Sequence, residues 1–125
     1  MITISTSKAP AAIGPYSQGK VVNGMLYASG QIPIIPETGD IIEGDITIQA
    51  HQAIKNVGEI LKEAKSSYDN VVKTTCFLAN MDDFAAFNKV YEEYFTSKPA
   101  RSCVAVKTLP KNVLCEVEVI AVVEE

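Results

Sequence analysis

Two stretches of the chain repeat apolar residues with the spacing of an amphipathic helix. The first follows Asp45, which can cap a helix, and continues to about Ala64. Its apolar positions recur at i, i+3, i+4 and i+7, and are Ala50, Ala53, Ile54, Val57, Ile60, Leu61 and Ala64. The second begins at Asn80 or Asp82 and ends near Phe95, with an apolar side made of Phe84, Phe87, Tyr91, Tyr94 and Phe95. We therefore predict two helices that each bury one side.

Five other segments have the β-branched or alternating composition of strands. They comprise residues 16–22, 25–31, 71–79, 101–107 and 113–123. Asn23 and Gly24 separate the first two segments, and because both residues tolerate the positive φ of a tight turn, the pair predicts a hairpin. The predicted order of elements is β-β-α-β-α-β-β, which is typical of an α+β layered domain.

The last predicted strand is apolar on both faces. Alternate side chains of a strand point to opposite sides of the sheet. One side therefore carries Val113, Cys115, Val117, Val119 and Ala121, and the other carries Leu114, Ile120 and Val122. Two helices can cover only one face, and an antiparallel sheet open to water would alternate polar and apolar residues. We therefore expect the second apolar face to contact another subunit.

Length and charge narrow the class of protein. The 125 residues suffice for one domain, residues 1–125, with a hydrophobic core. A net charge of −4 and a pI of about 5.0 disfavour a phosphate-backbone partner, so we expect no nucleic acid. No stretch approaches the roughly 20 apolar residues that span a membrane. The first five residues do not resemble a signal peptide, so the expected location is the cytoplasm.

Cysteine and histidine are too sparse for a disulfide framework or a zinc site. The chain has three cysteines, Cys76, Cys103 and Cys115, and no CxxC pair. Its one histidine, His51, falls on the polar side of the first helix, where we expect it to be solvated. We predict that the protein binds no metal.

Three charged residues interrupt the apolar pattern of the predicted sheet. Glu116 and Glu118 lie on the same face as Ile120, so either that face is partly hydrated, each glutamate pairs with a structural cation, or one has a function. Arg101 opens a strand and shares a face with Cys103. Its planar guanidinium suits a carboxylate, which belongs either to a structural salt bridge or to a ligand.

Four uncharged residues also allow a structural and a functional interpretation. Asn88 lies within the apolar stripe of the second helix, so its amide either bonds nearby backbone or points into a site. Cys103 is typical of a small buried residue rather than a nucleophile. Ser29 suits a turn, with no His–Asp pair to activate it, and Tyr16 suits either a rim or the core.

Three segments resemble signatures of the Rid (YjgF/YER057c) family. They are residues 11–19, residues 28–33, and residues 99–104 followed by 109–111 and 116–118. The segments occur in the family's order, and the similarity covers essentially the whole chain. The run PARSCV and the later E-x-E are similar to the RidA branch in particular. One departure is the short loop 96–100, in which Lys98 precedes the proline where family members often have Phe.

This resemblance implies a chorismate-mutase-like fold, with a mixed sheet and two helices on one face, that forms a homotrimer with clefts between subunits. It also implies a cofactor-independent 2-iminobutanoate/2-iminopropanoate deaminase, which hydrolyses reactive imino and enamine acids to 2-keto acids and ammonia. In that enzyme Arg101 would hold the substrate carboxylate and Glu116 would activate water. The pocket would be lined by Tyr16, Ser29, Gly30, Asn88 and Cys103.

Two other functions fit the same resemblance. The protein could keep the trimer and the cleft and bind small metabolites as a regulator without chemistry, although the presence of Arg101 and Glu116 favours the enzyme. The family has also carried the label of translation inhibitor with ribonuclease activity. The acidic pI and the single histidine disfavour that activity.

Overall fold

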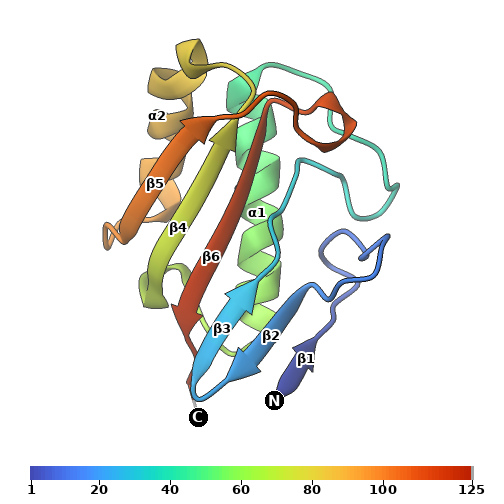
Figure 1. The fold of residues 1–125 in the computed structure, drawn as a ribbon, viewed down its shortest axis with the longest axis vertical. Helices are drawn as coiled ribbons and strands as arrows, with labels where there is room; N and C mark the ends of the chain where they lie inside the picture. Colours follow the sequence, from blue (N-terminus) through green and yellow to red (C-terminus); the bar gives the residue numbers. More distant parts are fainter. Residues whose placement is uncertain (125) are drawn as a thin grey trace.

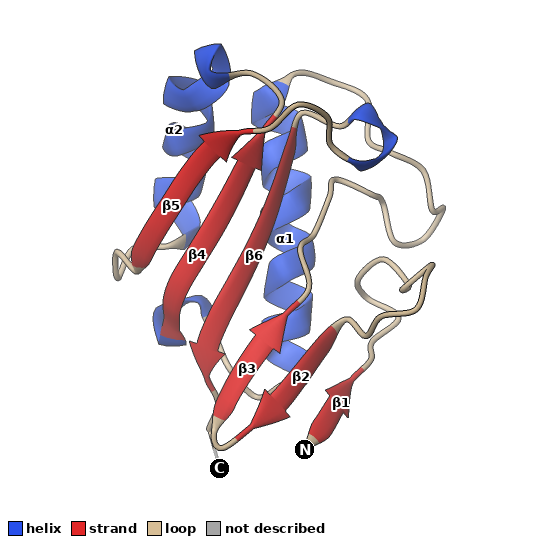
Figure 2. Cartoon of the chain, viewed as in Figure 1, coloured by secondary structure: helices blue, strands red, loops and turns tan. Residues whose placement is uncertain are grey.

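The structure is a computed structural model that describes residues 1–124, and it forms one six-stranded sheet with two helices on one face (Figure 1, Figure 2). The strands are β1 (Ile2–Ile4), β2 (Gly19–Val22), β3 (Met25–Ala28), β4 (Val71–Leu78), β5 (Ala100–Ala105) and β6 (Cys115–Val122). The helices are α1 (Ile46–Glu63) and α2 (Phe84–Tyr94), and short 3-10 turns are η1 (Tyr68–Asn70), η2 (Met81–Asp83) and η3 (Pro110–Asn112). The predicted α+β fold is confirmed.

The strands lie in the order β1-β2-β3-β6-β4-β5, so the last strand of the chain is in the middle of the sheet. Strands β4 and β5 are parallel and are connected through α2, whereas every other neighbouring pair is antiparallel. A parallel pair requires a crossover connection, which the second helix provides. The sheet is therefore mixed, and β5 is one of its edges.

Helix α1 begins and ends where the sequence predicts. The Asp45 side chain accepts a hydrogen bond of 3.1 Å from the Ile48 amide, which satisfies one free donor of the first turn. All seven residues of the predicted apolar stripe are buried against the sheet. Asn80 caps η2, the turn that precedes α2, through a 2.9 Å bond from the Asp82 amide. The two predicted helices are thus confirmed.

The two faces of β6 differ as the sequence pattern predicts. One face is buried beneath the two helices and carries Cys115, Val117, Val119 and Ala121. The alternate residues, Glu116, Glu118 and Ile120, are half-buried, and Val122 is exposed. The face of the sheet away from the helices, which we call the open face, is therefore apolar in part, and no helix of residues 1–124 covers it (Figure 2).

Two features of the fold departed from the sequence prediction. Strand β1 was missed, because three residues are too few to show a period, and it pairs with β2 at the sheet edge. The first hairpin is shorter than predicted, because its pairing ends with Gly19 opposite Ala28. Its turn at Asn23-Gly24 has the positive φ angles expected. Within residues 1–124, neither helix has the length and hydropathy to cross a membrane.

Candidate functional site

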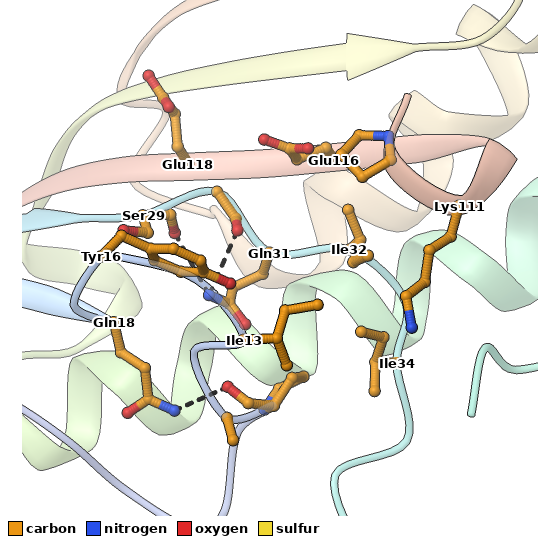
Figure 3. A pocket seen from close by; sticks show the side chains of 14 residues that line it. Ile13, Tyr16, Gln18, Ser29, Gln31, Ile32, Ile34, Lys111, Glu116 and Glu118 are labelled. Atoms are coloured by element: carbon orange, nitrogen blue, oxygen red, sulfur yellow. Dashed lines mark hydrogen bonds between the residues drawn. The ribbon is translucent and has the colours of Figure 1, made fainter. Parts of the chain in front are cut away.

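A pocket with a volume of about 510 Å³ opens beside β6, and we call it the Glu116 pocket (Figure 3). It is bounded by the loop that precedes β2, the segment that follows β3, the turn η3 and the open face of β6. It collects four of the predicted site residues, namely Tyr16, Ser29, Gly30 and Glu116. These residues are up to 100 positions apart in the sequence, and the sheet order brings them together.

Glu116 is the residue of this pocket whose pKa is shifted. Its side chain is half-buried, and burial, followed by the charge of nearby Glu118, raises its pKa above the usual value of a glutamate. A carboxyl group with a raised pKa exchanges protons more readily near neutral pH. In residues 1–124 no lysine, arginine or histidine lies within salt-bridge distance of either glutamate. The interpretation of Glu116 and Glu118 as structural ion pairs is therefore wrong within one chain.

Gly30 is required by the position of the Glu116 carboxylate. A Cβ atom added at Gly30 would overlap Glu116 Oε2 and crowd its Cδ and Cγ, so any other residue would displace the acid. The segment is held in place by Gln31, whose amide and carbonyl both bond to Val117, at 2.8 and 3.0 Å. Ser29 fixes the other side, because its hydroxyl donates to the Ser17 carbonyl at 2.6 Å.

Tyr16 lies at the rim rather than in the core. It is 51% exposed, and its ring stands at the mouth of the pocket (Figure 3). The loop that carries it is tied down by Gln18, a buried residue whose amide donates to Thr6 and Pro10 carbonyls at 3.0 and 2.8 Å. The rim interpretation of Tyr16 is confirmed, and Gln18 anchors the loop to Thr6 and Pro10.

The far end of the Glu116 pocket is mostly apolar, which the sequence did not reveal. Ile13, Ile32 and Ile34 line it, and Lys111 lies at its edge (Figure 3). Pro110 also lines the pocket. Lys111 has a positive φ of 56° in η3, which turns the chain sharply at this point. The available signal was the Leu109-Pro110-Lys111 motif, but a motif gives no indication of the pocket to which it contributes.

Arg101 lies in a different cavity, a groove of about 350 Å³ between β5 and α2 that we call the Arg101 groove. Its Nη1 donates a 2.7 Å hydrogen bond to Asn88 Oδ1. The guanidinium carbon stands 4.7 Å from the centre of the Tyr91 ring and 5.5 Å from that of Phe84. Aromatic contact and one hydrogen bond hold the guanidinium plane in a fixed orientation.

The Arg101 guanidinium has no carboxylate partner among residues 1–124. The structural salt-bridge interpretation of Arg101 is therefore wrong for the isolated chain. Asn88 does not bond the backbone either, since its side-chain oxygen accepts from the arginine. Tyr91, which the sequence assigned to the core, also forms part of the groove, where its hydroxyl bonds Thr74 at 2.7 Å.

Cys103 lies on the same strand as Arg101, two residues further along, and is half-buried. A hydrogen bond with Cys76, and then the charge of Arg101, lower the pKa of Cys103 to about 7. It lines neither cavity. His51 is not simply solvated, because its Nδ1 lies 2.9 Å from the Tyr94 hydroxyl, and it links the two helices.

The two cavities lie on opposite faces of the sheet. Arg101 and Val119 both pair with Thr74 of β4, so Arg101 points to the face that the helices cover. Glu116 pairs with Phe77 and points to the open face. Strand β4 also separates the strands that carry them. Arg101 and Glu116 of one chain therefore cannot contact the same small molecule.

Comparison with known proteins places the chain in a family. The family described as Endoribonuclease L-PSP matches residues 6–123. A Lactococcus lactis protein proposed to be a regulator, AldR, is 58% identical over 99% of each chain. The 2-iminobutanoate/2-iminopropanoate deaminase of Mus musculus is 50% identical over 95% of this chain and 89% of its own. The chain therefore belongs to the Endoribonuclease L-PSP family.

Solved structures agree with this assignment. The Yersinia pestis protein YyfA, of the Rid protein family, superposes with a TM-score of 0.95 at 50% identity over 98% of each chain. Escherichia coli TdcF, solved with bound serine, superposes with a TM-score of 0.94 at 42% identity, over 99% of this chain and 100% of its own. The resemblance to the Rid family noted in the sequence is confirmed.

Proposed function

We propose that this protein hydrolyses 2-imino acids, such as 2-iminobutanoate and 2-iminopropanoate, to 2-keto acids and ammonia. One observation carries the proposal: a guanidinium fixed on an aromatic ring and an asparagine has no carboxylate partner among residues 1–124. Such a group is suited to a carboxylate from outside. The deaminase name of the mouse relative and the serine bound to TdcF, which is itself a small carboxylate, support the same class of ligand.

The active site of this proposal is shared between copies of the chain. Arg101 and Glu116 face opposite sides of the sheet, so one copy would supply the Arg101 groove and a neighbour the Glu116 pocket. A ring of copies satisfies this pairing at every contact, because a head-to-tail interface closes into a cyclic oligomer. We propose a homotrimer. The partly apolar open face, which includes Val104 and Val122, would lie within it.

In the proposed reaction, the Arg101 groove of one copy binds the substrate and the Glu116 pocket of its neighbour transfers protons. Arg101 binds the substrate carboxylate through two parallel N–H donors and so fixes the direction of the C=N bond. Glu116 of the neighbour accepts a proton from a water molecule as the water oxygen attacks the imine carbon. The imine nitrogen takes that proton to give a neutral carbinolamine. Glu116 then transfers the carbinolamine hydroxyl proton to the same nitrogen as the C=O bond forms and the C–N bond breaks, so ammonia leaves and the 2-keto acid remains. The raised pKa of Glu116 makes its carboxylate a stronger base toward the attacking water.

The direct test generates 2-iminobutanoate with an amino-acid dehydratase and traps the remaining imine with semicarbazide. Wild-type protein should lower the yield of semicarbazone in proportion to its concentration, before and after dialysis against a chelator. A parallel measurement of mass by native mass spectrometry should give three times the chain mass of 13.5 kDa. Unchanged semicarbazone formation in the presence of the trimer would contradict the enzymatic proposal.

A second candidate function is a metabolite-binding regulator that keeps the shared cleft. The observation in its favour is the identity of 58% to AldR, which is higher than that to the mouse deaminase. The two candidates differ in one measurement, since a regulator would bind a 2-amino or 2-keto acid through Arg101 without accelerating hydrolysis of the imine.

A further inference from the structure

Two cysteine side chains lie next to each other on neighbouring strands and have no role in the proposed hydrolysis. Cys76 of β4 and Cys103 of β5 are paired in register, and both are free thiols. Neighbouring strands are about 4.7–4.9 Å apart, within the range of about 4.4–6.8 Å that Cα atoms of disulfide-linked cysteines occupy. In-register residues also point to the same face of the sheet. The strand spacing is therefore compatible with a disulfide between them.

The two thiols differ in their access to solvent. Cys76 is fully buried, with its sulfur 4.0 Å from Thr74 Oγ1, whereas Cys103 is half-buried on the edge strand. Arg101 lies on the same face, two residues before Cys103. An accessible cysteine beside a cation, with a second thiol behind it, is the arrangement in which an oxidised sulfur is captured by a resolving thiol.

We propose that Cys103 and Cys76 form a redox modification site, in which a hydroperoxide oxidises Cys103 and Cys76 resolves it as an intramolecular disulfide. The Cys103 sulfur attacks the terminal oxygen of the hydroperoxide, the O–O bond breaks, and the alkoxide or hydroxide leaves with a proton. The Cys76 sulfur then attacks the sulfenic sulfur, its S–O bond breaks, and water leaves. Two thiols and one hydroperoxide thus give one disulfide, one alcohol or water, and one water.

The pKa of Cys103, which is lowered to about 7, supports this assignment of roles, because the thiolate is the nucleophile. The hydrogen bond with Cys103, and then burial, raise the pKa of Cys76, which keeps that thiol protonated. The disulfide would tie the edge strand β5 to β4 directly behind the Arg101 groove. It would also close a loop that contains α2, which constrains the unfolded chain.

The test treats the full-length protein with graded hydrogen peroxide, blocks remaining thiols with an alkylating reagent, and maps peptides by mass spectrometry. We expect a linked Cys76–Cys103 peptide that dithiothreitol releases, and a higher unfolding temperature of the oxidised protein without reductant. Cys115 provides the internal control. Its thiol is buried and its pKa is raised to about 12, so it should stay reduced.

Two variants separate the roles of the thiols. Cys76→Ala should accumulate a Cys103 sulfenic acid that dimedone traps, whereas the matched variant Cys115→Ala should still form the disulfide. If wild-type Cys103 instead proceeds to sulfinic acid, or links only to Cys103 of another copy, the proposal is wrong. Failure of peroxide to modify Cys103 at all, under conditions that oxidise free cysteine, would overturn it equally. None of these readouts depends on imine hydrolysis.

Discussion

The Glu116 pocket and the Arg101 groove are built on different principles. The pocket depends on a close approach of two backbone segments. Gly30 leaves space for a carboxylate, and Gln31 is hydrogen-bonded to β6 through both of its main-chain groups. Side chains make the groove, where Asn88 and Tyr91 hold one guanidinium. Within residues 1–124 no cation lies at salt-bridge distance from the Glu116 carboxylate, and no carboxylate lies at that distance from the Arg101 guanidinium. In the proposed function, each is half of a site for a polar substrate with a carboxylate and an electrophilic carbon.

In the proposed function, the two cavities have different duties, one in chemistry and one in binding. Glu116 can take part in proton transfer, whereas Arg101 holds a fixed charge in both the ground state and the transition state. Variants of the two halves should therefore change different kinetic constants, and the size of each effect distinguishes a shared catalytic site from two unrelated cavities.

The largest loss is expected from Glu116→Gln. An amide can hold a water molecule but cannot take its proton, so kcat should fall by about 10²-fold, near the lower end of the contribution of a positioned general base. The KM should change little, because binding rests on the other half. Steady-state hydrolysis of 2-iminobutanoate measures both constants. A full kcat in the trimeric variant would show that Glu116 is not the base.

Arg101→Ala should reduce kcat/KM by roughly 30-fold or more, since removing one partner of a buried charge pair costs on the order of 2–5 kcal/mol and about 1.4 kcal/mol corresponds to a decade. Arg101→Lys should restore little, because an ammonium cannot make two parallel hydrogen bonds. Both variants should remain trimers by native mass spectrometry. Wild-type kinetics in trimeric Arg101→Ala would contradict its role as the carboxylate clamp.

Asn88 allows a finer distinction within the groove. Asn88→Ala removes the 2.7 Å bond that orients the guanidinium and should raise KM several-fold with kcat nearly unchanged. Asn88→Asp keeps the geometry but supplies a competing carboxylate, so its KM should rise further. Equal KM values for the two variants would mean that Asn88 acts by packing alone.

The smallest effect concerns pH and Cys103. Its pKa of about 7 means that the thiolate is largely absent below pH 6 and largely formed above pH 8. Because that negative charge lies near Arg101, it weakens the binding of a carboxylate, so KM should rise about two- to threefold across this window. Cys103→Ala should keep most of the activity and lose this dependence. Near-total inactivation of a trimeric Cys103→Ser would instead indicate covalent chemistry.

The sequence predicted features that depend on residues close together in the chain, and it missed those that depend on distant residues. The stripe of α1 and its cap at Asp45 are local, so the helix was placed correctly. The alternation of side chains along β6 is also a local pattern, and it separated Glu116 from the helix-covered face. The contact of Gly30 with Glu116 and the pairing of β5 with β4 depend on strand order, which no local pattern contains. The likeness to a family supplied the candidate site residues, whose roles stay predictions, but not their distribution over the two faces of the sheet.

The central claim, a site that takes Arg101 from one copy and Glu116 from another, can be tested by mixing two inactive variants. Arg101→Ala and Glu116→Gln, carried on differently tagged chains, are co-expressed, and the mixed trimers are isolated by both tags. In every mixed cyclic trimer, one of the three shared sites combines an intact Arg101 with an intact Glu116, so imine hydrolysis by the isolated mixed trimers should return to about a third of wild type. Mixed trimers that stay as inactive as either parent would contradict the claim, because a site contained in one chain is never repaired by mixing.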